Sequence, residues 1–71
     1  MNRSSIRDAL KHQPFKSFVL LMLDGQKFEI NSPDVIGVSP NQEIAVIFTT
    51  NNYHIIDTTK IVSLEIYENK N

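Results

Sequence analysis

The N-terminal residues have the hydrophobic spacing of a short amphipathic helix. Apolar side chains recur at helical intervals from Ile6 to Leu10, and the sequence from Ser5 matches a helix N-cap. Pro14 should end the helix, because a proline in a further turn would lack an amide donor and would clash with the preceding turn. We therefore expect a helix over residues 4–13.

From Ser17 onward the hydrophobic pattern changes to that of β-strands. The run from Phe18 to Leu23 is apolar at both parities, which is typical of a strand covered on both faces. Asp24-Gly25 predicts a hairpin turn of type I′, which needs a positive φ at both residues. Ser32-Pro33-Asp34 interrupts the following strand, so we expect a sharp bend there. The predicted strands are residues 18–23, 26–38 with this bend, 43–50, 53–56 and 61–67.

A helix followed by five short consecutive strands predicts a mainly β protein. A meander whose strands are apolar on both faces must curl to cover them, and the bent second strand would let one sheet fold over on itself. We therefore expect a strongly bent five-stranded antiparallel sheet that forms a small barrel over residues 17–67. With 71 residues the chain has room for one core only, so residues 1–71 are predicted to be a single domain.

Charge is distributed unevenly along the chain. The formal net charge is −1, yet residues 1–16 carry a charge of +3 and residues 17–71 one of −4. Arg3, Arg7 and Lys11 follow one another at intervals of four, which would place them on one flank of the helix. This basic stripe is either an ordinary solvated helix face or a contact surface for nucleic acid.

The sequence offers little for catalysis or metal binding. It has no cysteine, and its two histidines, His12 and His54, are far apart. Gly25 and Gly37 are too distant from each other for a phosphate-binding loop. We therefore expect no enzyme activity, no metal and no cofactor. The longest apolar run, six residues, is far shorter than the about 20 needed to span a membrane, and without a signal-like N-terminus we expect a cytoplasmic protein.

The order of these elements resembles the Sm-like family of small β-barrels. Local similarities are Ala9-Leu10-Lys11-His12, the strand and turn from Leu20 to Gly25, and Lys60-Ile61-Val62. The chain is also similar to a group of short uncharacterised bacterial proteins with Gln-Pro-Phe after a helix, here Gln13-Pro14-Phe15. Thr58 and Thr59 stand where the Sm-like family has a basic and an imidazole side chain facing the pore.

The resemblance implies a homo-oligomeric ring of about five to seven subunits. Such a ring would join the fourth predicted strand of one subunit to the fifth of the next, which would satisfy edge amides that are a liability in a monomer. A monomeric barrel is the alternative. The residues expected at the subunit interface are Tyr53, His54, Ile55, Ile56, Ile61, Val62, Leu64 and Ile66.

Two functions follow as hypotheses. The first is weak binding of RNA or other single-stranded nucleic acid by an Sm-like ring. Its expected contacts are Arg3, Arg7, Lys11, His12 and Lys16. The second is a protein–protein interaction module of SH3-like barrel fold that binds no nucleic acid and uses Phe15, Tyr53 and Tyr67. A phage or mobile-element protein that only assembles into a ring would have the same sequence features.

Overall fold

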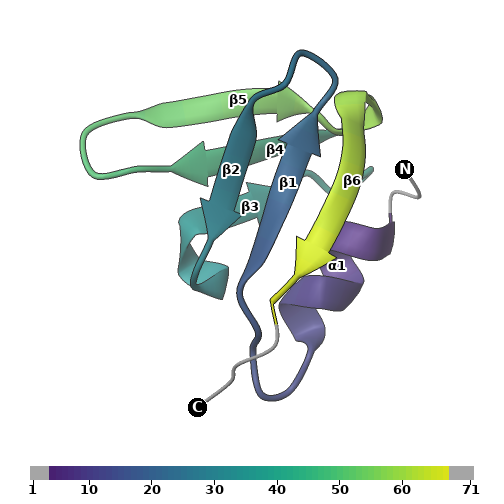
Figure 1. Ribbon diagram of the computed structural model, residues 1–71, viewed down its shortest axis with the longest axis vertical. Helices are drawn as coiled ribbons and strands as arrows, with labels where there is room; N and C mark the ends of the chain where they lie inside the picture. Colours follow the sequence, from purple (N-terminus) through teal and green to yellow (C-terminus); the bar gives the residue numbers. More distant parts are fainter. Residues whose placement is uncertain (1–3, 68–71) are drawn as a thin grey trace.

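The computed structural model describes residues 4–67 and is mainly β, with one short helix (Figure 1). Its elements are α1 (Ser4–Lys11), β1 (Phe18–Met22), β2 (Lys27–Ile30), β3 (Ile36–Val38), β4 (Ile44–Phe48), β5 (Tyr53–Asp57) and β6 (Ile61–Ile66). Two single 3₁₀ turns, η1 (Pro33–Val35) and η2 (Thr58–Lys60), precede β3 and β6.

The strands form two antiparallel sheets of three strands each. The order in one sheet is β2-β1-β6 and in the other β3-β4-β5. Figure 1 shows β1, β2 and β6 upright in front, β4 and β5 running across behind them, and α1 beside the lower part of β6. Strand β1 therefore pairs with β6, although more than 30 residues of the chain separate the two strands.

The predicted five-stranded bent sheet closing into a barrel is wrong. The structure has six strands in two sheets, and neither sheet is closed into a barrel. The predicted second strand, residues 26–38, is two strands that belong to different sheets. Between them the Oγ of Ser32 accepts a hydrogen bond from the amide of Asp34 (3.2 Å), and Pro33 starts the turn η1. A capped helical turn with a proline cannot continue a strand ladder, so the interruption separates two sheets instead of bending one.

The turn between β1 and β2 also differs from its prediction. The amide of Gly25 donates to the carbonyl of Met22 (3.0 Å), and the amide of Met22 donates to the carbonyl of Gln26 (2.8 Å). The loop therefore has three residues rather than two. Within residues 4–67 positive φ occurs at Gly25 (94°) and at one non-glycine residue, Gln42, so Asp24 is not left-handed as a type I′ turn requires.

The core lies between the two sheets and is covered at one side by α1. Alternate residues of β1 point inward, and Phe18 and Leu20 are fully buried. In α1, Ile6 is 1% exposed and packs into the same cluster. The core cluster consists of Ile6, Ala9, Phe18, Leu20, Met22, Phe28, Ile30, Ile36, Ala45, Ile47, Ile56 and Ile61. Over the described residues, the structure contains no helix with the length and apolarity that a membrane crossing demands.

Candidate self-association surface

The outer faces of the two sheets differ in character. On β2-β1-β6, Val19 is flanked by Glu29 on one neighbouring strand and Glu65 on the other, so charged side chains cover this face. The outer face of β3-β4-β5 is apolar instead. Its most exposed apolar side chains are Ile44 (48% exposed), Phe48 (53%), Tyr53 (64%) and Ile55 (65%). A contiguous apolar face of this kind in a small protein commonly marks an interaction surface.

The register of the β4–β5 hairpin explains why these side chains gather. Phe48 lies opposite Tyr53, and Val46 opposite Ile55. The Phe48 and Tyr53 rings are 6.5 Å apart between centroids, within the range of favourable aromatic pairs. In β4 the residues between them, Ala45 and Ile47, point the other way and are buried. Strand β4 is thus apolar on both faces, with one face covered by protein and one exposed.

Within residues 4–67, β5 pairs with β4 on one side only, which leaves its other edge with unpaired backbone groups. The amide of Thr58 donates to the carbonyl of Glu43 (3.0 Å) at one end of the hairpin, and that of Thr49 donates to Asn52 (2.8 Å) at the other. Hydrogen-bonded and non-hydrogen-bonded pairs alternate in an antiparallel ladder. The amides and carbonyls that point away from β4, toward the free edge, are therefore those of Tyr53, Ile55 and Asp57.

The free edge of β6 follows from the same alternation of hydrogen-bonded pairs. The amide of Tyr67 donates to the carbonyl of Ser17 (2.9 Å), so Glu65 makes the next hydrogen-bonded pair with β1. The backbone groups of Leu64 and Ile66 therefore point away from β1. Leu64 is half-buried and Ile66 is 45% exposed, so this edge is apolar as well.

The other two sheet edges are protected in ways that natural proteins commonly use. At β2 the residues with edge-facing backbone groups are Lys27 and Glu29, and charged side chains discourage pairing with another strand. Strand β3 has only three residues and directly follows the turn begun by Pro33. Of the four edges, β5 and β6 are the two that carry apolar side chains without such protection.

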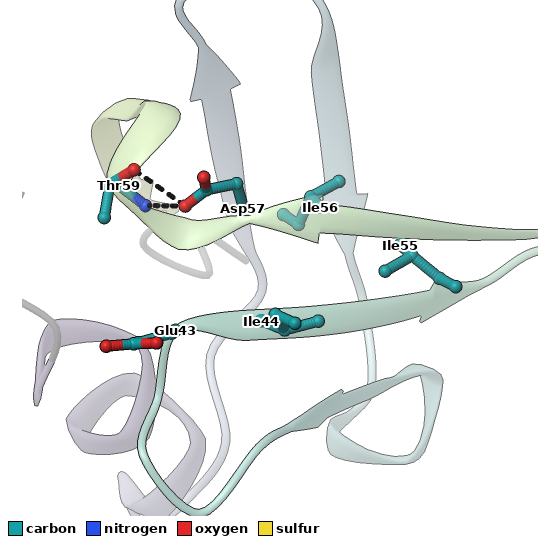
Figure 2. Close-up of a pocket in the computed structure, with 6 residues that line it drawn as sticks. All are labelled: Glu43, Ile44, Ile55, Ile56, Asp57 and Thr59. Atoms are coloured by element: carbon teal, nitrogen blue, oxygen red, sulfur yellow. Dashed lines mark hydrogen bonds between the residues drawn. The ribbon is translucent and has the colours of Figure 1, made fainter.

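An acidic pocket, open to solvent, lies where β5 ends. Figure 2 shows Glu43 and Asp57 at the same end of the hairpin, with Ile44 and Ile55 further along it. The Oδ1 atom of Asp57 accepts hydrogen bonds from the hydroxyl (2.7 Å) and the amide (2.9 Å) of Thr59. These bonds, the hydroxyl first, hold the pKa of Asp57 below its ordinary value, and the nearby charge of Lys60 acts in the same direction. Residues lining the pocket are Glu43, Ile44, Ile55, Ile56, Asp57 and Thr59.

The basic residues predicted to contact nucleic acid are only partly brought together. Arg7 and Lys11 lie on one flank of α1, where Arg7 is half-buried and Lys11 exposed. His12 is exposed, and its Nδ1 donates to the carbonyl of Pro14 (2.9 Å). Lys16 is half-buried beyond the helix, and Arg3 lies outside the described residues.

The predicted interface residues divide into two groups. Ile56 (9% exposed) and Ile61 (2%) belong to the core, and Leu64 packs against it. Those that are exposed are Tyr53, His54, Ile55, Val62 and Ile66. Their positions on β5 and β6 are those of the two unprotected edges.

Three aromatic residues were the expected contacts of a protein-binding module. Phe15 is half-buried, packs against the core, and has its ring 6.0 Å from that of Phe18, so it is a structural residue. Tyr53 and Tyr67 are exposed. Phe48 was not among the residues expected at a binding surface, although it belongs to the exposed apolar face of β4. The signal for this face is in the sequence, because every residue from Ile44 to Phe48 is apolar.

Comparisons with known proteins identify no relative. No family model, no curated protein and no solved structure matches the chain. Nothing in them supports membership of the Sm-like family. In residues 4–67 no group of three or more histidine, cysteine, aspartate or glutamate side chains is placed to hold a metal ion. The exposed apolar surface of β4, β5 and β6 is therefore the feature of the described residues that bears most directly on function.

Proposed function

We propose that the protein is a self-assembling interaction module whose copies join by pairing the free edge of β5 with the free edge of β6. The observation that carries this proposal is the contrast between edges: β2 and β3 are protected by charge or by shortness, whereas β5 and β6 have exposed apolar side chains. Because β5 and β6 are different surfaces, the contact is head to tail, and each copy can use both edges in a ring.

The two edges match in an antiparallel arrangement. Hydrogen-bonded pairs must form between residues whose backbone groups face the edge, and paired residues place their side chains on the same face. One register that meets these conditions places Ile55 opposite Leu64 of the second copy and Tyr53 opposite Ile66 of that copy. Each of these pairs covers apolar surface that is exposed or half-exposed in the single chain.

The energetics favour assemblies in which both edges are used. Full burial of one such side chain contributes about 1.5–3 kcal/mol, so the half-exposed residues at one contact contribute a few kcal/mol together. Association costs about 4–15 kcal/mol of lost freedom, which makes a single contact weak. A closed ring adds a contact without adding a further subunit, and we therefore expect a ring rather than a dimer.

The test is the mass of the particle in solution. Light scattering coupled to size exclusion should give a multiple of the 8.1 kDa chain mass for the wild-type protein. Ile55→Lys places a charge on the β5 edge and should give monomers, because lysine is the residue that natural edges use for protection. Glu29→Lys, on the β2 edge, is the matched control and should leave the mass unchanged. A wild-type particle of single-chain mass at all concentrations would refute the proposal.

Nucleic-acid binding by the flank of α1 is a second candidate. It is favoured by the exposure of Lys11 and His12 at the end of the helix, within a segment whose formal charge is +3. Asp8 is exposed on the same short helix, and its negative charge would weaken binding of nucleic-acid phosphates. Titration of single-stranded RNA should then show affinity that falls with salt, and Arg7→Ala with Lys11→Ala should reduce the salt slope by about 2. Affinity without a salt slope would exclude this surface.

A further inference from the structure

The outer face of the β3-β4-β5 sheet is a surface distinct from the edges of β5 and β6. Strand β4 is the middle strand of its sheet, so its outward side chains, Ile44, Val46 and Phe48, belong to this face and to neither edge. Pairing of strand edges extends a sheet sideways and leaves these side chains uncovered. The inward face of the same sheet is already covered by the core. An apolar outward face therefore still lacks the second layer that such a face requires.

A glycine opens the middle of this face. Gly37, Val46 and Ile55 lie in one row across the three strands. A Cβ atom at Gly37 would meet no other atom within 4 Å, so the β3 side of the row is open space above the backbone. Val46 is half-buried, whereas Ile55 is 65% exposed and borders the row at β5. A glycine within a strand is often the place where another molecule approaches the backbone closely.

The formal charges of this sheet are all negative. From the start of β3 to the end of β5 the chain has no lysine or arginine, and its two acids, Glu43 and Asp57, lie at the same end of the β4–β5 hairpin (Figure 2). His54 lies on the inward face of β5. Lys60 in the following turn acts on Asp57, which leaves one carboxylate in excess at this end. A partner with lysine or arginine complements this charge, whereas the phosphates of nucleic acids and anionic lipids do not.

The dimensions of the face match those of one helix. Three strands at a spacing of about 4.8 Å are about 10 Å wide between the outer two, and a helix with its side chains is about 10–12 Å across. Strand β4 has five residues, which extend over about 16 Å. About three turns of a helix, with apolar residues on one side, would cover this length.

We propose that the outer face of the β3-β4-β5 sheet binds an amphipathic helix of another protein, with apolar side chains over Gly37, Val46 and Phe48 and a lysine or arginine near Glu43. Charge favours this occupant over a second copy placed face to face, because strands β3, β4 and β5 of that copy would supply no lysine or arginine. The proposal does not depend on the β5–β6 contact, since β4 takes no part in that contact.

The experiment titrates the protein into a fluorescent leucine–lysine peptide of about 14 residues, whose leucines have helical spacing. The same peptide with glutamate in place of lysine tests the charge. Phe48→Thr and Gly37→Gln should each weaken binding of the lysine peptide about 5-fold or more, by removing apolar surface or filling the open row. Glu43→Gln should weaken it about 2- to 5-fold at low salt. The controls are Leu23→Thr, at an exposed residue beyond β1, and Glu65→Gln, on the other sheet.

The lysine peptide should bind more tightly than the glutamate peptide, and the two controls should match wild type. No binding up to about 1 mM, equal binding of both peptides, or an unchanged affinity of Phe48→Thr would overturn the proposal. Light scattering of Phe48→Thr supplies a further test. A particle mass lower than that of wild type would show that a second copy covers this face, and it would overturn the proposal as well. Circular dichroism of each variant shows that the fold is retained.

Discussion

Gln42 occupies an unfavourable position for its residue type. Its φ is 61°, in the left-handed region, and its side-chain Oε1 is buried without a hydrogen-bond partner among the described residues. Its backbone is nonetheless needed there, because the carbonyl of Gln42 accepts a hydrogen bond from the hydroxyl of Thr58 (2.7 Å). The strained backbone of Gln42, in the turn between β3 and β4, thus places its carbonyl where it accepts the hydrogen bond from the Thr58 hydroxyl.

Gln42→Gly should stabilise the protein. Glycine adopts a left-handed φ without the steric cost and removes the unpaired amide oxygen, while the carbonyl remains. We expect the free energy of unfolding to rise by about 1 kcal/mol, measured by urea titration. Gln26→Gly is the control, because Gln26 is exposed and has no left-handed φ, and it should lower stability. Equal losses in the two variants would contradict this account.

Asp57 gives the protein a stability term that depends on pH. Its folded-state pKa is lowered from 3.8, chiefly by the hydroxyl and amide of Thr59. A group with a lowered folded-state pKa stabilises the fold above its unfolded pKa, and this contribution is lost as pH falls through the folded-state value. Wild type should therefore be more stable than Asp57→Asn at pH 7, and the difference should begin to shrink as the pH falls toward 3.8 and disappear only below the lowered folded-state pKa. A difference that stays constant over this range would show that the charge plays no part.

At the scale of elements, α1 depends on its contact with the sheets. Its eight residues are too few for a stable isolated helix, so its stability must come from the buried face. Ile6→Ala should lower the free energy of unfolding by about 2–5 kcal/mol, because Ile6 is 1% exposed and its loss leaves a cavity. Urea titration followed by circular dichroism measures this. Lys11→Ala, at an exposed position of the same helix, should change stability by less than about 0.5 kcal/mol.

The β2 edge owes its protection to two charged residues. Lys27 and Glu29 have edge-facing backbone groups, and both side chains are exposed. The double substitution Lys27→Val with Glu29→Val should create a third unprotected edge, with the β propensity of valine added. We expect light scattering to show particles larger than wild type, or turbidity. Unchanged particle mass would mean that something other than charge protects this edge.

At the scale of the molecule, assembly and stability should be linked. A chain of 71 residues buries only about 60% of its unfolded surface, and subunit contacts are a common supplement at this size. The wild-type thermal midpoint should therefore rise with protein concentration, whereas that of Ile55→Lys should not. Calorimetry over a 100-fold range of about 10 µM to 1 mM tests this. A wild-type midpoint that is independent of concentration would argue against assembly as a source of stability.

The candidate site was predictable in part. Exposed residues of both unprotected edges, such as Ile55 and Ile66, stood among the expected interface residues, because alternation marks strands and resemblance suggested which edges pair. Ile56 and Ile61 stood there too, but the structure buries them in the core. Alternation shows which residues share a face of a strand, but the strand alone does not show which of its two faces is covered. That depends on the sheet that packs against it.

The sequence by itself determined the local elements: a helix before Pro14, which ends at Lys11 rather than at the expected residue 13, a glycine at the positive-φ position after β1, and strands with the spacing of their apolar residues. These follow from steric and hydrogen-bonding preferences of neighbouring residues. Only the tertiary structure decided that the chain at Pro33 passes from one sheet to another, and that β6 pairs with β1. Such pairings join residues far apart in the chain. They are stabilised by a core that residues from many segments share, so the sequence of one segment does not determine them.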